Sequence, residues 1–160
     1  MSTDALQVDY ERLVFALIQV CGSTAACRDH GDVETVAVLA EYYALVAEAV
    51  GACGGQIVKV LGDGVLVTFP VDRAKEAVDG LRGCQSAGSA LWSEFDSRCR
   101  VQVKAGAGRI AAGYFGPPGA EWFDVYGTAL NELFRAPSVD FMVTGELGDL
   151  LGARVPDHPS

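Results

Sequence analysis

The sequence has few of the residues on which zinc sites and disulfide frameworks depend. It contains two histidines, His30 and His158, and an odd number of cysteines, none of them in a Cys-x-x-Cys pair. Single cysteines scattered among apolar residues are typical of reduced core positions in a reducing compartment, and they give a zinc site little support. The five cysteines are Cys21, Cys27, Cys53, Cys84 and Cys99.

Basic residues are also scarce. The chain has 12 Lys and Arg residues against 21 Asp and Glu residues, which gives a formal net charge of −9. Because phosphate backbones and anionic lipids select basic surfaces, this balance argues against nucleic acid or a membrane as the main partner. We interpret the acidity as a contribution to solubility.

Long apolar runs are absent near the N-terminus. The first run, Leu13–Ile18, follows an acidic and polar segment and is too short to span a bilayer. We therefore expect no signal peptide, no membrane anchor and a cytoplasmic location.

Two common nucleotide-binding motifs are missing as well. The glycine-rich segment 106–113 lacks the G-x-G-x-x-G spacing and continues into a strand rather than a helix, which excludes a Rossmann site. The sequence contains no P-loop.

What the chain does contain is enough apolar sequence for a proper core. Half of its 160 residues are hydrophobic, and no repeat or long linker divides it. We expect one domain over residues 1–160, with a core at about 12–151, a polar lead-in over 1–9 and a polar C-terminal tail.

Periodicity predicts an α+β fold with helices on one side of a mainly antiparallel sheet. Apolar residues recur at helical spacing from Val36 to Val50, and Asp63-Gly64 between two β-rich runs indicates a hairpin. Strands are expected at 12–20, 56–61, 65–69, 99–106, 109–115, 122–125 and 139–143. Helices are expected from about 24 to 53, and at 72–95, 128–136 and 146–151.

Three segments carry more specific information. The first runs from Leu13 through Gln19 to Gly22-Ser23-Thr24; the second is Lys59-Val-Leu-Gly62-Asp63-Gly64; the third is Asp124-Val-Tyr-Gly127-Thr-Ala-Leu-Asn131-Glu-Leu-Phe-Arg135. Taken singly, each has an ordinary explanation. Asp before Gly is typical of a turn, a lysine on a strand is usually solvated, and Asn and Arg four residues apart on a helix commonly form a surface pair.

In this order and spacing, the three segments resemble the class III adenylate/guanylate cyclase catalytic domain, and the resemblance covers about residues 12–151. It implies a ferredoxin-like cyclase homology domain that dimerises. It also implies sites at the dimer interface, where one chain supplies the metal-binding carboxylates and the other the purine-binding and transition-state residues.

The resemblance assigns a role to each matching position. Asp63 takes the place of one metal ligand, and Gln19 stands where the family has the second metal-binding Asp. Lys59 and Asp124 occupy the purine-reading positions with the residue types that favour ATP over GTP. Asn131 would orient the ribose, and Arg135 would neutralise charge on the phosphates.

A glutamine at position 19 weakens the expected metal site. Two cations bridged by carboxylates support this kind of phosphoryl transfer, and Mg²⁺ prefers charged oxygens. If the substitution removes about 3–5 kcal/mol of transition-state stabilisation, the rate falls roughly 10²–10⁴-fold. We therefore expect Mg²⁺ or Mn²⁺ to bind weakly or not at all. Aligning the missing Asp with Leu17 instead would be worse for metal binding.

Three hypotheses follow. The first is an ATP-binding pseudo-cyclase, weakly active or inactive, in intracellular signalling. The second is a genuine but slow adenylate cyclase that converts ATP to cyclic AMP and pyrophosphate. The third is a subunit of a heterodimeric cyclase, which donates its purine-binding and transition-state residues to a partner that supplies both carboxylates. ATP is the expected ligand in each, with either a homodimer or a heterodimer as the assembly.

Overall fold

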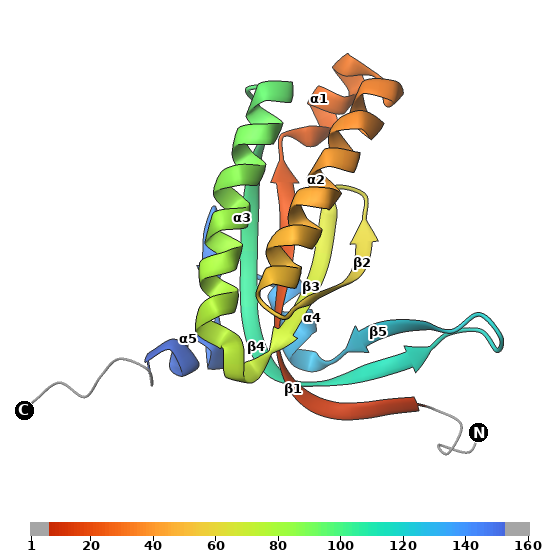
Figure 1. Ribbon diagram of the computed structural model, residues 1–160, viewed down its shortest axis with the longest axis vertical. Helices are drawn as coiled ribbons and strands as arrows, with labels where there is room; N and C mark the ends of the chain where they lie inside the picture. The colour runs from red at the N-terminus through yellow and green to blue at the C-terminus, as the bar shows by residue number, and fades with distance from the viewer. Residues whose placement is uncertain (1–6, 153–160) are drawn as a thin grey trace, which may run out of the picture.

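A computed structural model describes residues 7–152; residues 1–6 of the polar lead-in and residues 153–160 of the tail, with His158, lie outside this range. The order of elements is β1 (Gln7–Cys21), α1 (Ser23–His30), α2 (Asp32–Ala52), β2 (Gln56–Leu61), β3 (Gly64–Pro70), the 3₁₀ turn η2 (Val71–Arg73), α3 (Ala74–Phe95), β4 (Arg100–Phe115), β5 (Trp122–Tyr126), α4 (Thr128–Arg135), β6 (Phe141–Val143) and α5 (Gly145–Gly152). This is the expected mixed α+β architecture (Figure 1).

The sheet is mainly antiparallel, as predicted. Its strands run in the order β2-β3-β1-β4-β5, and the short β6 pairs with β4 in parallel. β1 is central, between β3 and β4, and its residues 14–18 are buried on both faces. The strand is longer than the predicted 12–20, because residues 7–11 continue the ladder with β4 although their sequence is polar.

β4 corrects the prediction of two strands at 99–106 and 109–115. It is one continuous strand, and the glycines inside it mark close packing instead of a turn. A Cβ on Gly106 would lie 3.0 Å from the ring of Phe15 and from Thr144 Oγ1, and a Cβ on Gly108 would lie 3.1 Å from Ala129. Small residues are therefore required where neighbouring elements approach the strand closely.

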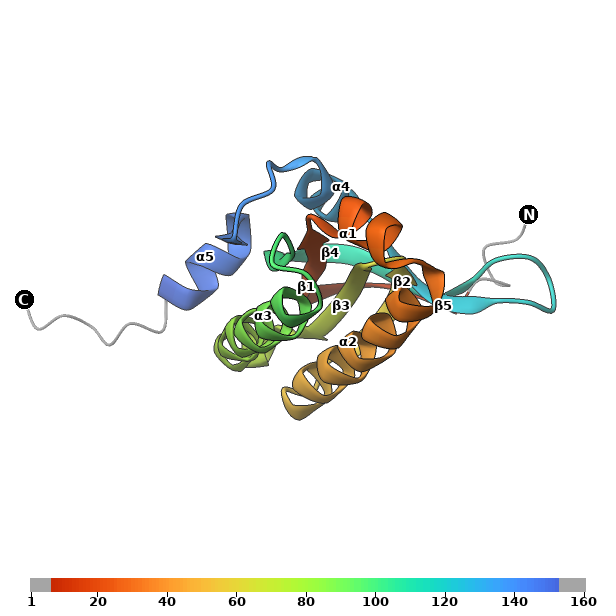
Figure 2. The ribbon, with the colours of Figure 1, turned by 90° about the horizontal axis from the view of Figure 1, so that it is seen from above.

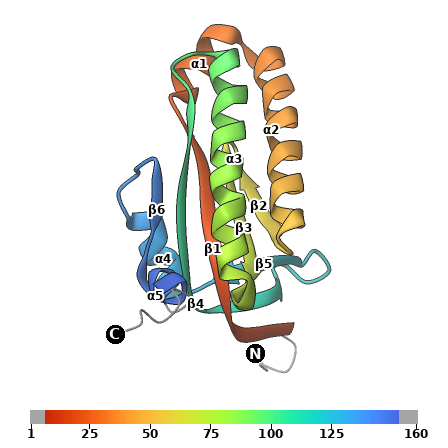
Figure 3. The same cartoon turned by 60° about the vertical axis from the view of Figure 1, so that its left-hand side comes forward.

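Helices cover both faces of the sheet, in contrast to the one-sided arrangement that the sequence predicted. α2 and α3 pack against the face formed by Val14, Ala16 and Ile18 of β1. The alternate residue Phe15 points to the other face, where it packs with Leu130 and Leu133 of α4. Figures 2 and 3 show α4 on the side of the sheet opposite to α2 and α3. The period-two alternation of a strand accounts for the two cores.

α2 is confirmed as a helix, but it is apolar on almost every side. One of its windows has a mean hydropathy of 1.4, high enough for a membrane span by composition and length. The side chains that it buries in the core are Val38, Tyr42, Val46 and Val50, whereas Val36, at the start of the predicted stripe, is 64% exposed. The packing of the helix on the sheet decides which of its faces is covered.

The lower parts of β1 and β4 bend away from the helices together with β5 and form an arm, residues 7–12, 109–115 and 122–126 (Figure 1). Four exposed aromatic side chains belong to it: Tyr10, Tyr114, Trp122 and Tyr126.

Candidate functional site

Asp63 lies in the tight turn between β2 and β3, where the Asp-Gly signal predicted a hairpin. Gly62 adopts a left-handed conformation with φ of 65°, which a residue without a side chain adopts readily. The carboxylate of Asp63 accepts a hydrogen bond from the hydroxyl of Ser23, at the N-terminus of α1. The hydroxyl of Tyr43 donates a 2.5 Å hydrogen bond to the carbonyl of Gly62. Two helices therefore hold the turn that carries the carboxylate.

The electrostatic surroundings of the turn support this description. The pKa of Tyr43 is raised, first by burial and then by the negative charge of Asp63. The hydroxyl of Tyr43 accordingly stays protonated and remains a donor to the turn. The Asp63 carboxylate itself faces the start of α1, where the free N–H groups of a helix favour a negative charge.

Gln19 is beside this turn, on the strand that pairs with β3. Ile18 is opposite Val65 in the ladder, and Gln19 Cγ lies 3.9 Å from the position that a Cβ would take on Gly64. Position 19 therefore lies at the same end of the strands as the turn that contains Asp63, as the resemblance implied.

These donors do not fit a pair of divalent cations. Gln19 offers a neutral amide oxygen, and the carboxylate of Asp63 in the neighbouring turn is already hydrogen-bonded to Ser23. Two closely spaced cations need bridging carboxylates to offset their mutual repulsion. Within residues 7–152, no group of three or more His, Cys, Asp or Glu side chains is arranged to hold a metal ion.

The two predicted purine-reading residues are brought together, although 65 positions separate them in sequence. Lys59 Nζ on β2 lies 3.2 Å from both carboxylate oxygens of Asp124 on β5. Asp124 is buried, and its Oδ1 also accepts a 2.8 Å hydrogen bond from the backbone N–H of Val125. The indole N–H of Trp122 donates to Oδ2 at 3.3 Å. Trp122 is half exposed, and its indole N–H makes this polar contact.

Asn131 and Arg135 both lie on α4, one turn apart, as the i, i+4 spacing predicted. Glycine lets this helix approach the sheet closely. A Cβ on Gly127, just before the helix, would lie 2.9 Å from the side chain of Ile110. The Asp-x-Tyr-Gly segment thus serves to place α4 directly on β4. Within the described part of the chain, Arg135 is exposed and forms no hydrogen bond or ion pair.

Sequence reasoning missed Lys104, which holds the end of this helix. Its side chain is 4% exposed and projects from β4 on the face that α4 covers. Lys104 Nζ donates to the carbonyls of Phe134 at 3.3 Å and of Ala136 at 2.9 Å. These belong to the last carbonyl groups of α4, which have no partner inside the helix. The signal in the sequence is a lone charge in the middle of an apolar strand.

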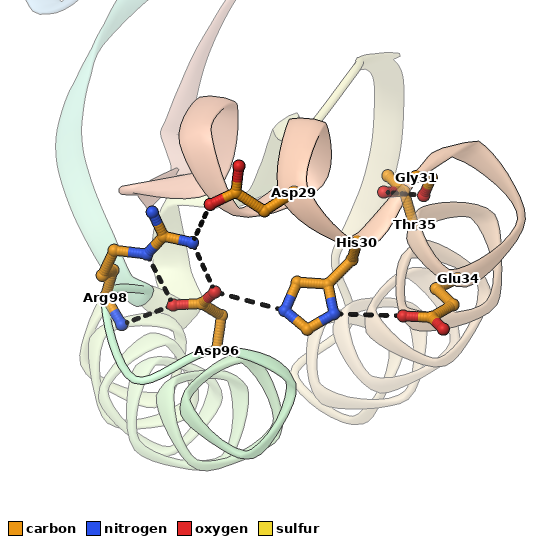
Figure 4. A network of polar contacts seen from close by, with 7 residues as sticks. All are labelled: Asp29, His30, Gly31, Glu34, Thr35, Asp96 and Arg98. Atoms are coloured by element: carbon orange, nitrogen blue, oxygen red, sulfur yellow. Dashed lines mark hydrogen bonds and ion pairs between the residues drawn. The ribbon is translucent and has the colours of Figure 1, made fainter.

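A second feature that the sequence analysis missed is a polar network at the far end of α1 (Figure 4). His30 contacts Glu34 through Nδ1 at 3.0 Å and Asp96 through Nε2 at 3.2 Å. Arg98 pairs with Asp96 at 2.7 Å and with Asp29 at 2.8 Å. Because α1 begins at Ser23, this network and the Ser23–Asp63 hydrogen bond anchor opposite ends of the same short helix.

One cavity between α2 and α3 is lined by Glu34 of this network and by none of the predicted site residues. It measures about 380 Å³ and is lined in part by Glu34, Glu41 and Glu94. Three carboxylates repel a triphosphate, so this cavity is not suited to a nucleotide. The expected reduced core cysteines are confirmed for Cys84 and Cys99, which are free and buried; burial raises the pKa of the Cys84 thiol to about 11.

Comparison with known proteins agrees with this geometry. No protein-family profile matches the sequence. The chain is 36% identical over 64 residues to adenylate cyclase 2 of Rhizobium meliloti (strain 1021), which covers 40% of the chain and 18% of that protein. It is 28% identical over 146 residues to adenylate cyclase type 10 of Oryctolagus cuniculus, which covers 82% of the chain and 9% of that protein. The chain thus spans less than a fifth of either relative.

Solved structures give the same result for the fold. The adenylyl cyclase CyaB of P. aeruginosa superposes with a TM-score of 0.84 at 18% identity, over 93% of this chain and 84% of that one. The guanylyl cyclase Cya2 superposes with a TM-score of 0.81 at 19% identity, over 91% and 80%. The fold is that of the class III nucleotide cyclase catalytic domain. The chain therefore has the fold of these cyclase domains, and its sequence is similar to those of two adenylate cyclases, in agreement with the resemblance seen in the sequence.

Proposed function

We propose that this domain is a nucleotide-binding pseudo-cyclase, which binds ATP and has very weak or no adenylate cyclase activity. The observation that carries the proposal is the position of Gln19 beside the turn that contains Asp63, where a two-metal site would need two carboxylates. A neutral amide does not offset the repulsion between two divalent cations, so the transition state of cyclisation loses electrostatic stabilisation. Nucleotide binding depends less on this pair of cations.

The choice of ATP rests on Lys59 and Asp124. Their 3.2 Å contact presents a donor from β2 and an acceptor from β5 side by side. Adenine offers a ring nitrogen that accepts and an amino group that donates, whereas guanine presents the opposite polarity at the corresponding edge. Similarity to two adenylate cyclases supports the same choice.

Asn131 and Arg135 would act on the ribose and the phosphates. The helix that carries them is anchored at its start by the close approach of Gly127 and at its end by Lys104. A guanidinium group that is exposed and held at a fixed helix terminus suits an anionic ligand.

The active assembly would be a dimer. The exposed aromatic residues of the arm, such as Tyr10 and Tyr126, form an apolar surface of the kind that protein interfaces cover. A homodimer would contain two sites with the Gln19 defect. A heterodimer whose partner supplies both carboxylates would instead use the intact Lys59–Asp124 pair and α4 of this chain. A cytoplasmic location, and the absence of a nucleic-acid or membrane partner, stay predictions.

Isothermal titration with ATP, with and without Mn²⁺, tests the proposal when it is run beside a cyclic-AMP assay on the same purified protein. We expect ATP to bind and cyclic AMP to form at a rate roughly 10²-fold or more below that of an intact cyclase. ATP binding with brisk turnover would make the chain a genuine cyclase, and would contradict the pseudo-cyclase proposal. If ATP does not bind, both the pseudo-cyclase and the slow cyclase are excluded for the isolated chain. Co-purification with a second cyclase-domain chain would then support the heterodimer.

A further inference from the structure

Both oxygens of the Asp124 carboxylate already have partners in the structure. An ionised carboxylate offers about four lone-pair sites. Oδ1 accepts from the Val125 backbone N–H and faces Lys59, and Oδ2 accepts from Lys59 and from the indole N–H of Trp122. A ligand amino group that approaches Asp124 therefore competes with these donors.

The three donors differ in how easily they can move. The Val125 N–H is part of the backbone of β5, and the Lys59 ammonium is at the end of a flexible four-carbon stem. Trp122 is fixed by packing: its ring covers Gly116, where an added Cβ would come within 2.7 Å of the indole. Gly116 also has φ of 140°, a conformation that other residues rarely adopt. Lys59 is thus the donor that can turn away.

We propose that Trp122 is a specificity-determining residue of the base subsite, which holds Asp124 as an oriented acceptor when Lys59 turns to a purine that carries its amino group at C6, as adenine does. This deepens the proposed function and rests on it. Without the indole N–H, the nearly buried carboxylate would lose a partner on Oδ2 at the moment when Lys59 leaves, and such a group is costly to leave unpaired.

The geometry also places the indole beside the ligand. Trp122 and Asp124 are two residues apart on β5, so they project from the same face of the sheet. Asp124 is 9% exposed and Trp122 is 50% exposed. Because the indole N–H lies 3.3 Å from Oδ2, a base that binds Asp124 would lie beside Trp122.

Replacing Trp122 with Phe tests the assignment, because Phe keeps a ring and removes the N–H. We expect the affinity for ATP to fall about tenfold and the affinity for GTP to change much less, so that the ratio of the two affinities moves toward one. Titration of each nucleotide into the wild type and the variant gives this ratio. Ser93→Ala is the control, because it removes one hydrogen-bond donor from an exposed side chain on α3, away from the arm.

Tryptophan fluorescence gives a second readout that does not depend on the variant. The chain has two tryptophans, and Trp92 is fully buried. Quenching by iodide therefore reports mainly on Trp122, and we expect ATP to protect it.

The outcomes separate the two proposals. A wild type that binds neither nucleotide overturns the proposed function and the Trp122 assignment with it. If the wild type binds ATP, two results overturn the Trp122 assignment and leave the proposed function standing. One is a Trp122→Phe variant that keeps the wild-type ratio of ATP to GTP affinity, and the other is that ATP does not protect Trp122 from iodide.

Discussion

The ammonium group of Lys104 and the carbonyl oxygen of Ala136 form a 2.9 Å hydrogen bond inside the protein, between the middle of β4 and the residue that follows α4. The same ammonium group donates to the carbonyl of Phe134. One side chain of a strand thereby provides partners for the C-terminal end of the helix that carries Asn131 and Arg135. The position of Arg135 consequently depends on a residue 31 positions earlier in the sequence.

Replacing Lys104 with Met should lower both stability and nucleotide affinity. Met keeps most of the apolar stem but leaves two carbonyls at the helix end without their donor, which costs about 2 kcal/mol. We expect urea unfolding to show this loss, and ATP titration to show weaker binding at a temperature where the variant is folded. Lys75→Met, on the exposed side of α3, should change neither quantity. Unchanged affinity in a folded Lys104→Met variant would mean that α4 keeps its position without this contact.

Replacing Gln19 with Asp should restore a response to divalent cations. Without metal, the new carboxylate lies near the turn that contains Asp63, and two like charges close together destabilise the fold. Mn²⁺ should reverse this effect, so the thermal midpoint of the variant should rise with Mn²⁺ more than that of the wild type. Cyclic-AMP formation should increase roughly 10²-fold or more.

Gln102→Asp is the matched control for that experiment. Gln102 is directly opposite Gln19 on β4, so the variant adds the same charge one strand away. If both variants gain activity equally, general negative charge is responsible. If neither responds to Mn²⁺, other residues of the site are also deficient.

Replacing Ser23 with Ala should loosen the turn that carries Asp63. The variant loses the hydrogen bond to the carboxylate, and water can replace it in part because Asp63 is half-buried. We expect a loss of about 1 kcal/mol in urea unfolding. Thr24→Ala, at the exposed neighbouring position, should stay within about 0.5 kcal/mol of the wild type. A larger loss in Thr24→Ala than in Ser23→Ala would contradict the proposed anchor.

Stability should fall at acid pH because of Asp96. Hydrogen bonds from the Arg98 side chain and backbone lower the pKa of Asp96 well below its usual value, with a further contribution from His30. Since the folded pKa is below the unfolded value of about 3.9, the ionised group stabilises the fold above that pH, and the contribution is lost as pH falls toward the folded pKa.

Urea midpoints measured at about pH 7, 4 and 2.5 test this dependence. An Asp96→Asn variant should be less stable than the wild type at neutral pH and should lose less stability on acidification. Asp79→Asn, on the exposed side of α3, should follow the wild-type profile. Parallel profiles for the wild type and Asp96→Asn would show that Asp96 does not contribute.

Much of the fold could be predicted because local rules decide it. The alternation of buried residues in β1 follows from the two-residue period of a strand. The hairpin follows from its Asp-Gly turn, and α4 ends before Pro137 because proline has no N–H for the helix. The candidate residues could be found because their order and spacing in three segments match one family. The residue types taken one by one did not identify a site, because each is common in an ordinary structural role.

Other features depended on what packs against each segment. The glycines of β4 suggest a break in sequence, yet they keep the strand continuous because Phe15 and Ala129 lie where their side chains would be. The sequence of α2 is apolar on nearly all sides, so only contact with the sheet determined its buried stripe.

The sequence alone determined the order of the elements and the presence of a neutral amide at position 19, because both are properties of the chain itself. Only the tertiary structure decided that Lys59 contacts Asp124, that Trp122 donates to the same carboxylate, and that Lys104 holds the end of α4. These are contacts between strands, or between a strand and a helix, whose geometry arises when the sheet and the helices pack together.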